Sequence, residues 1–259
     1  MEWFAYRPDS VTVWSNEEVR KRLSWYYRVM SDEKPAKYLI AKRIPIDIDI
    51  KGADERELWE EHERASEDFM EIWGKIKEDA LSLTDLERPR KSLLDLKVEI
   101  AYRILRECRF CERRCRVNRA EGEKGTCRLD SRTYLSSYFL HMGEEAPLVP
   151  SATFFFCSCN FRCVFCQNYD ISQEWMKGGS CFEVGPEGLA ALFEEMRKRG
   201  GRNINLVGGD PTPNVHTILD ALNRSRVNFP VLWNSNSVSY THLRAHETSL
   251  HLVCRLLLE

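Results

Sequence analysis

The stretch "FFFCSCNFRCVFCQN", residues 154–168, places an apolar run directly before a loop rich in cysteine. The apolar, β-prone "TFFF" at 153–156 predicts a buried strand. Three of the cysteines that follow have the spacing C-x3-C-x2-C: Cys159, Cys163 and Cys166. Thiolates this close on one turning loop can bind three irons of a [4Fe–4S] cluster, which usually has four cysteine ligands. Three ligands leave one iron open to a substrate or cofactor, and part of a zinc site is the alternative.

Alternating strand and helix patterns follow this loop. We predict a helix over 186–199, a strand over 203–209, a helix over 215–223 and a strand over 230–236. This order is typical of parallel βα units, whose sites form at the carboxyl ends of the strands. The cysteine loop and "GGDPTP", residues 208–213, each follow a predicted strand, so we expect both to lie where chemistry occurs.

A second set of cysteines lies upstream, with the spacing C-x2-C-x3-C-x11-C. Its members are Cys108, Cys111, Cys115 and Cys127. Four thiols can close a tetrahedral zinc site or complete an iron–sulfur cluster, and four unligated thiols are the alternative. We expect Cys157 to be a small buried apolar residue and no fourth ligand of the first set, because ligation by Cys157 would close the open iron position.

Residues 1–107 are rich in charge and predict mainly helices. Ser15 and Glu18 form a capping-box pattern before a helix. Helices are also predicted over 54–78 and 91–107, while the alternating isoleucines of 43–50 predict a short strand. His62, on the apolar face of the second helix, is interpreted as a packing residue.

The last residues, 238–259, read as the translation of a sequencing adapter. We therefore expect them to be non-native, to ligate nothing and to mark a truncated chain. This interpretation rejects His242 and His246 as a helical metal pair and removes Cys254 from the cysteine set.

The composition is that of an ordinary globular protein, with 43% apolar residues, 30% charged residues and a net charge of −2. This balance favours neither a nucleic-acid partner nor a membrane surface. No signal-peptide pattern stands at the start, so we expect a cytoplasmic protein. Structural disulfides are rare there, and ten cysteines in that setting favour metal ligation.

The cysteine loop and the glycine-rich turn together resemble the radical S-adenosylmethionine (SAM) superfamily. The resemblance implies an oxidoreductase in which the open iron binds the amino and carboxylate groups of SAM, and reductive cleavage releases a 5′-deoxyadenosyl radical. It places Phe165 near the adenine and the turn of Gly208, Gly209 and Asp210 at the methionine ammonium. Asp210 stands where glutamate is common in the superfamily.

A narrower resemblance covers residues 108–236, through "CRFCERRCRVNRAEGEKGTC", "HMGEEAPLVPS", "CNFRCVFCQN", "NLVGGDPTP" and "WNSN". These motifs are similar to radical SAM proteins related to pyruvate formate-lyase activating enzyme, although "CSCN" replaces the expected "SGCN". The resemblance implies a glycyl-radical enzyme as protein substrate and a flavodoxin- or ferredoxin-type electron donor. A non-catalytic iron–sulfur or zinc protein, acting as an electron carrier or binding module, is the alternative.

The resulting hypothesis is an α/β protein with a truncated, partial (β/α)6 radical SAM barrel. A helical region (1–107) and a cysteine-rich element (108–150) precede the incomplete barrel (151–237) and the adapter-derived tail (238–259). The expected cofactors are a [4Fe–4S] cluster and SAM, with zinc or a second cluster at the upstream cysteines. Asn234 and Asn236 either line the mouth of the barrel or cap a turn. His141, Glu144 and Glu145 either approach the substrate or are solvated.

Overall fold

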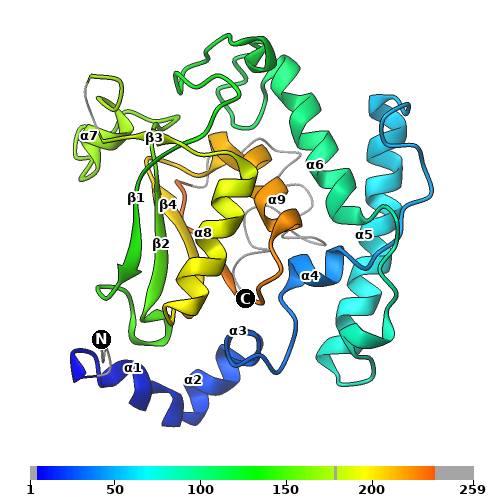
Figure 1. The fold of residues 1–259 in the computed structure, drawn as a ribbon, viewed down its shortest axis with the longest axis vertical. Helices are drawn as coiled ribbons and strands as arrows, with labels where there is room; N and C mark the ends of the chain where they lie inside the picture. Colours follow the sequence, from blue (N-terminus) through cyan, green and yellow to red (C-terminus); the bar gives the residue numbers. More distant parts are fainter. Residues whose placement is uncertain (1–4, 178–179, 237–259) are drawn as a thin grey trace.

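The computed structural model describes residues 5–177 and 180–236, which form a five-stranded sheet with helices packed against it (Figure 1). The strands are β1 (Tyr134–His141), β2 (Ser151–Phe156), β3 (Phe182–Glu183), β4 (Ile204–Gly208) and β5 (Val231–Trp233). Their order across the sheet is β3-β1-β2-β4-β5. The pairs β2–β4 and β4–β5 are parallel, whereas β1 runs antiparallel to β2 and to β3.

The three parallel strands and the two helices between them confirm the predicted βα pattern. Helix α8 (Pro186–Lys198) joins β2 to β4 and begins at a proline, which suits the first turn of a helix. Helix α9 (Val215–Arg224) joins β4 to β5 and packs beside α8. Phe154 and Phe156, on one face of β2, and Thr153, on the other, are buried, as expected for a strand covered on both faces. The predicted partial (β/α)6 barrel remains a prediction.

Helices and single turns make up the N-terminal region. They are α1 (Asp9–Thr12), η2 (Val13–Ser15), α2 (Glu17–Arg22), α3 (Ser24–Met30), α4 (Lys37–Ala41), α5 (Glu55–Lys77), η3 (Leu83–Asp85), α6 (Leu93–Ile104) and η4 (Leu105–Glu107). The two long helices, α5 and α6, confirm the predictions over 54–78 and 91–107. Each begins with a capping box, Asp54 with Glu57 and Ser92 with Asp95.

Two local predictions for this region are wrong. The cap of α2 is Asn16, whose side chain accepts the amides of Glu18 and Val19, while Ser15 ends the turn before it. The predicted strand over 43–50 is an irregular segment, with a single bridge between Pro45 and Ser92. Pro45 has no N–H to donate to a ladder, and the isoleucines are buried against helices instead.

A shared core connects this helical region to the sheet. Helix α6 packs against α9, where Asn223 donates to Asp95 at 3.0 Å and Tyr102 donates to Asp220 at 3.3 Å. Between α5 and α6, the His62 ring lies 2.6 Å from the Lys97 ammonium, so His62 is the packing residue that the sequence predicted. The cysteine-rich element follows α6 and lies beyond its end (green in Figure 1).

The remaining short elements lie in the connections. They are η5 (Arg119–Glu121), η6 (Ala146–Leu148), α7 (Tyr169–Ser172) and η7 (Thr212–Asn214). Within the described part of the chain, no helix has both the length and the apolar character needed to cross a membrane.

Candidate functional site

The carboxyl ends of the parallel strands β2, β4 and β5 lie together and form the carboxyl edge of the sheet, as the sequence predicts. The amide of Gly209, after β4, donates to the carbonyl of Phe156 at the end of β2 (2.8 Å). The next amide, that of Asp210, donates to the Ser158 carbonyl at 3.0 Å. The amide of Asn236, after β5, donates to the Asp210 carboxylate at 3.0 Å. The edge is therefore held by contacts between three loops that are distant in sequence.

The three thiols of the cysteine loop lie near one another on this edge and are partly exposed. The Cys166 amide donates to the Cys163 carbonyl at 3.2 Å, and the Phe161 amide donates to the Cys159 sulfur at 3.3 Å. Burial, with smaller contributions from nearby Asp210, Cys166 and Cys163, raises the pKa of the Cys159 thiol to about 11, although the hydrogen bond from Phe161 opposes the change. The described residues contain no three side chains already gathered around a single metal ion. A cubane cluster does not require that geometry, because each cysteine binds a different iron. The donor set of this loop fits such a cluster.

The two glycines of the "GGD" turn permit close contact between β4 and β2. Gly208 has φ +121°, and a Cβ there would stand 2.3 Å from the Phe156 nitrogen. A Cβ on Gly209 would stand 1.7 Å from the Ser158 carbonyl oxygen. Both positions thus require glycine for packing between backbones. Contact of these glycines with SAM stays a prediction.

Asp210 is fully buried, and both of its carboxylate oxygens accept backbone hydrogen bonds. The Thr212 amide donates at 2.8 Å and the Asn236 amide at 3.0 Å. Burial raises the pKa of this carboxyl, while these hydrogen bonds oppose the change. In the structure Asp210 therefore ties the β4 turn to the loop after β5. Its predicted contact with the methionine ammonium is not tested.

The other predicted cofactor contacts differ in their position. The side-chain nitrogen of Asn236, Nδ2, lies 2.7 Å from Asn160 Oδ1 and 3.8 Å from the Cys159 sulfur, so Asn236 contacts the cysteine loop. Asn234 has an exposed side chain, and its backbone amide donates to Leu206 at 3.0 Å. Phe165 is 82% exposed, which leaves its ring available on the open side of the loop.

Several polar residues that the sequence did not single out brace the cysteine loop. Ser158 is fully buried with φ +76°, and its hydroxyl donates to the Cys127 carbonyl. The Ser172 hydroxyl lies 3.3 Å from the Cys166 sulfur, and the side-chain amide of Gln173 donates to the Phe161 carbonyl at 2.6 Å. The signal for Ser158 was present in "CSCN", where a polar residue stands between two cysteines at the end of an apolar strand.

Cys157 forms a disulfide with Cys181, with 6.4 Å between the Cα atoms. The prediction that Cys157 is buried is confirmed, but the interpretation as an unpaired apolar thiol is wrong. The general expectation of metal ligation over disulfides also fails for this pair, because a strand end and a loop 24 residues later bring the two sulfurs together. A sulfur bonded to Cys181 does not occupy the open cluster position.

The upstream cysteines lie on one compact segment, although the described residues contain no three of them gathered around a single metal position. Cys108 and Cys127 are buried, while Cys111 and Cys115 are partly exposed. The Cys108 amide donates to the Val117 carbonyl, and the Arg116 amide donates to the Cys108 carbonyl, both at 3.0 Å. The segment therefore folds back on itself.

His141, Glu144 and Glu145 do not lie at this edge. His141 ends β1 and pairs with Ser151 at the start of β2, so these residues stand at the opposite edge of the sheet. Glu144 contacts His141 at 3.3 Å and accepts from Asn205 at 3.0 Å. The structure thus places them away from the cysteine loop, because β1 runs antiparallel to β2, and whether they approach a substrate is not tested.

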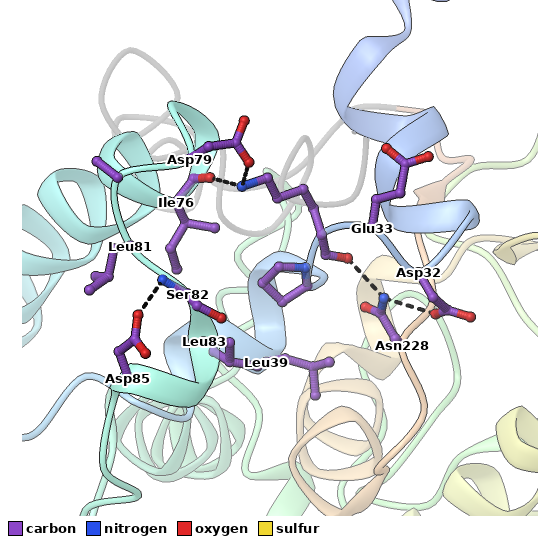
Figure 2. Close-up of a pocket in the computed structure, with 13 residues that line it drawn as sticks. Asp32, Glu33, Leu39, Ile76, Asp79, Leu81, Ser82, Leu83, Asp85 and Asn228 are labelled. Carbon is purple, nitrogen blue, oxygen red and sulfur yellow. Dashed lines mark hydrogen bonds and ion pairs between the residues drawn. The ribbon is translucent and has the colours of Figure 1, made fainter.

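A cavity of about 620 Å³ lies away from the cysteine loop, between the C-terminal end of α5 and the chain before β5 (Figure 2). Asn228 donates to Asp32 at 3.0 Å on one side, and the Ser82 amide donates to Asp85 at 2.8 Å on the other. None of the predicted site residues lines this cavity. Asn228 precedes the start of β5, so the cavity is near the amino ends of the parallel strands.

Comparison with known proteins agrees with the family that the spacing of the cysteine loop indicates. Residues 153–251 match the radical SAM superfamily. The chain carries a radical SAM domain. The superfamily implies a [4Fe–4S] cluster and SAM as cofactors, and the three-thiol loop provides ligands of the required type.

The chain is also similar to an uncharacterized protein from Methanocaldococcus jannaschii, with 45% identity over 218 residues. The similarity covers 83% of this chain and 61% of that protein, so the chain spans about three fifths of its relative. No solved structure shows a significant match. His242, His246, Cys254 and the rest of the predicted adapter-derived tail lie outside the described residues.

Proposed function

We propose that this protein is a radical SAM enzyme that cleaves SAM reductively and abstracts a hydrogen atom from its substrate. The observation that carries the proposal is the position of three neighbouring thiols at the carboxyl end of β2, beside the turn after β4 and the loop after β5. Ligands bind at such edges in parallel sheets. When bound, the reduced cluster supplies the electron that cleaves the sulfonium of SAM.

The chain's own residues hold the site in place. Cys159, Cys163 and Cys166 are the cluster ligands, and a fourth ligand position is left for SAM. Phe165, exposed beside Cys166, covers the adenine. Asn236 connects the loop after β5 to Asn160 and to the Cys159 sulfur. These contacts come from three strands, so the geometry is fixed by the sheet and not by the cysteine loop alone.

The proposed SAM contacts extend to Gly208, Gly209, Asp210 and Asn234, which stand at the same edge. Asp210 already accepts two backbone amides and holds the turn in one conformation. A carboxylate oxygen has more than one lone pair, so Asp210 can also accept an ammonium N–H that reaches this buried side chain. Asn234, exposed at the end of β5, completes the rim.

For the substrate, we infer a glycine of a partner enzyme, converted to a glycyl radical. The support is the similarity of the motifs over 108–236 to proteins related to pyruvate formate-lyase activating enzyme. The proposed electron source is a flavodoxin- or ferredoxin-type protein. We further infer low activity for the chain in this form, because in the described sheet β5 pairs only with β4.

Anaerobic reconstitution with iron and sulfide tests the radical SAM proposal. We expect about four irons and four sulfides at the cysteine loop, a change in the EPR spectrum of the reduced cluster on adding SAM, and 5′-deoxyadenosine after reduction. Cys163→Ser should abolish the SAM-dependent EPR change, whereas Cys181→Ser, which also removes one thiol, should retain it. An EPR spectrum indifferent to SAM would support a non-catalytic iron–sulfur protein, and uptake of zinc alone would support a zinc-binding module.

A further inference from the structure

The upstream cysteines lie on a segment whose backbone folds them toward one another. Two backbone hydrogen bonds between Cys108 and residues 116–117 bring the chain at the first cysteine of the set back beside the chain at the third. Between them, the Arg114 amide donates to the Cys111 carbonyl at 3.0 Å and closes a tight turn. Gly125 then lets the chain return, because a Cβ there would stand 3.0 Å from the Cys115 sulfur. Tight turns of this kind can bring neighbouring thiols to one metal centre.

N–H donors lie beside the sulfurs of this set. The Thr126 amide donates to Cys115 at 3.3 Å, and the Arg119 guanidinium donates to Cys108 at 3.7 Å. Burial raises the pKa of the Cys111 and Cys127 thiols, and the Arg113 and Leu129 amides oppose that change. A neutral thiol is a weak acceptor, whereas a thiolate gains much more from such donors. The donors at Cys115 and Cys108 therefore suit thiolates.

Arg119 supplies a second, independent observation. Its side chain is fully buried, and Nε and Nη2 donate to the Asp130 carbonyl at 3.0 and 2.7 Å. The Asp130 carboxylate instead pairs with Arg132 at 2.6 Å. In the described residues no carboxylate forms an ion pair with Arg119. A guanidinium cannot lose its proton, and a buried charge is costly unless an opposite charge compensates it. Its Nη1 instead lies 3.7 Å from the sulfur of Cys108, a group that can become negative.

We propose that Cys108, Cys111, Cys115 and Cys127 together bind one metal centre through four thiolates, and that the buried Arg119 balances its negative charge. Four thiolates on Zn²⁺ or on a [4Fe–4S] core with two positive charges leave the same net charge of about −2, so Arg119 can balance the charge of either centre. All four ligand positions are filled by protein, which makes the centre closed to substrate.

This centre would also hold the cysteine loop of the radical SAM domain. The Arg113 side chain, between the second and third ligands, donates to the Asn160 carbonyl at 3.1 Å. The Asn160 side chain in turn hydrogen-bonds the Cys111 sulfur. On the other side of Cys159, Ser158 donates to the Cys127 carbonyl. The two residues that flank Cys159 are therefore both fastened to ligands of the upstream centre or their neighbours, and Arg113, Asn160 and Ser158 act as positioning residues.

Metal analysis of the whole chain and its variants tests this inference. In Cys163→Ser we expect one tightly held centre per chain, either one zinc or about four irons with four sulfides, which decides between the two metals. In Cys111→Ser we expect that metal to be lost while the SAM-dependent EPR signal of the other site weakens. No metal retained in Cys163→Ser, or the same metal content in Cys111→Ser, would overturn the proposal.

Cobalt binding provides a measurement that does not depend on the survival of a cysteine variant. Titration of Co²⁺ into the metal-free Cys163→Ser chain should give the absorption of a four-thiolate centre, and its absence would contradict the inference. Arg119→Met should weaken Co²⁺ affinity at least about tenfold, because the buried thiolates lose their counter-charge. Arg106→Met, which removes an exposed arginine at the end of α6, should leave that affinity unchanged. If the protein keeps this metal centre but its EPR spectrum does not respond to SAM, the proposed radical SAM function is rejected and the inference of an upstream metal centre stands.

Discussion

The two cysteine sets differ in number of thiols, spacing and surroundings. The cysteine loop holds three partly exposed thiols within eight residues, at the end of a strand and beside a turn from a neighbouring strand. The upstream set holds four thiols spread over 20 residues, two of them buried around Arg119. An incomplete, accessible set suits a cofactor that must meet a ligand, whereas a complete, buried set suits a centre that only holds the chain together. The same residue type thus has two uses, distinguished by what surrounds it.

Gly209→Ala is expected to have the largest effect among these variants, and it should affect the cysteine loop without affecting the upstream cysteines. Its Cβ would stand 1.7 Å from the Ser158 carbonyl oxygen, and both atoms belong to backbone that cannot swing away. We expect a loss of about 3 kcal/mol or more in the free energy of unfolding and little cluster at the cysteine loop. The upstream centre should keep its metal. Denaturant unfolding and metal analysis measure both.

Gly74→Ala is the matched control for this substitution, because nothing lies within 4 Å of the added Cβ in α5. We expect it to raise stability by up to about 1 kcal/mol, since alanine is a better helix former than glycine. Equal stability of the two variants would show that the turn after β4 is not packed against β2 as the structure has it.

Asp210→Asn is expected to have the next largest effect. An asparagine has one acceptor oxygen, so it cannot accept both the Thr212 and the Asn236 amides as the carboxylate does. One buried N–H would lose its partner, at a cost of about 2–3 kcal/mol. Thermal unfolding measures the loss, and Asp170→Asn, an exposed aspartate on α7, should change little. An unchanged midpoint for Asp210→Asn would show that this carboxylate does not hold the edge together.

The periodic elements of the fold were predictable from the sequence, because their signals are local. The predicted elements β2, α8, β4, α9 and β5 follow apolar runs separated by proline and glycine, whereas the short α7 and β3 between β2 and α8 were not predicted. The segment 43–50 was not predictable in the same way. Alternating isoleucines fit a strand, but a strand also needs a neighbour, and here helices α5 and α6 bury the isoleucines instead.

For the site, the sequence predicted which loops meet but not which atoms bind. The meeting of "GGD" with the cysteine loop follows from parallel strands, whereas the direction of β1 placed His141 at the far edge. The Cys157–Cys181 disulfide and the Asn160 contacts depend on loops whose path no periodicity reveals. The burial of Arg119 could not be predicted either, because nothing in the sequence distinguishes this arginine from the exposed ones.

Gly125→Ala tests the upstream set with a smaller effect than the changes at the cysteine loop. The added Cβ would stand 3.0 Å from both Cβ and the sulfur of Cys115, which have room to shift slightly. We expect a loss of about 1–2 kcal/mol in metal binding, or about tenfold in Co²⁺ affinity. Gly122→Ala is the control: its φ of +93° strains the backbone, but nothing lies within 4 Å of the Cβ. That variant should lose stability without a selective loss of metal affinity, and equal Co²⁺ affinities would contradict the close packing of Gly125 on Cys115.

Lys97 offers the smallest and most specific contrast, between two buried cations. Burial lowers the pKa of Lys97 to about 7, so this side chain can become neutral beside His62, whereas Arg119 cannot. The folded-state pKa lies below the ordinary value, so between about pH 7 and pH 10 the unfolded chain binds more protons, and stability rises with pH. In Lys97→Met this rise should shrink by up to about 1 kcal/mol per pH unit, although Lys42, whose pKa is about 8, contributes to the rise in both proteins. Arg119→Met should leave the rise unchanged. Urea unfolding at pH values of about 7.5 and 8.5 measures it, and parallel curves for the wild type and Lys97→Met would mean that Lys97 keeps its proton and that the two buried cations are alike.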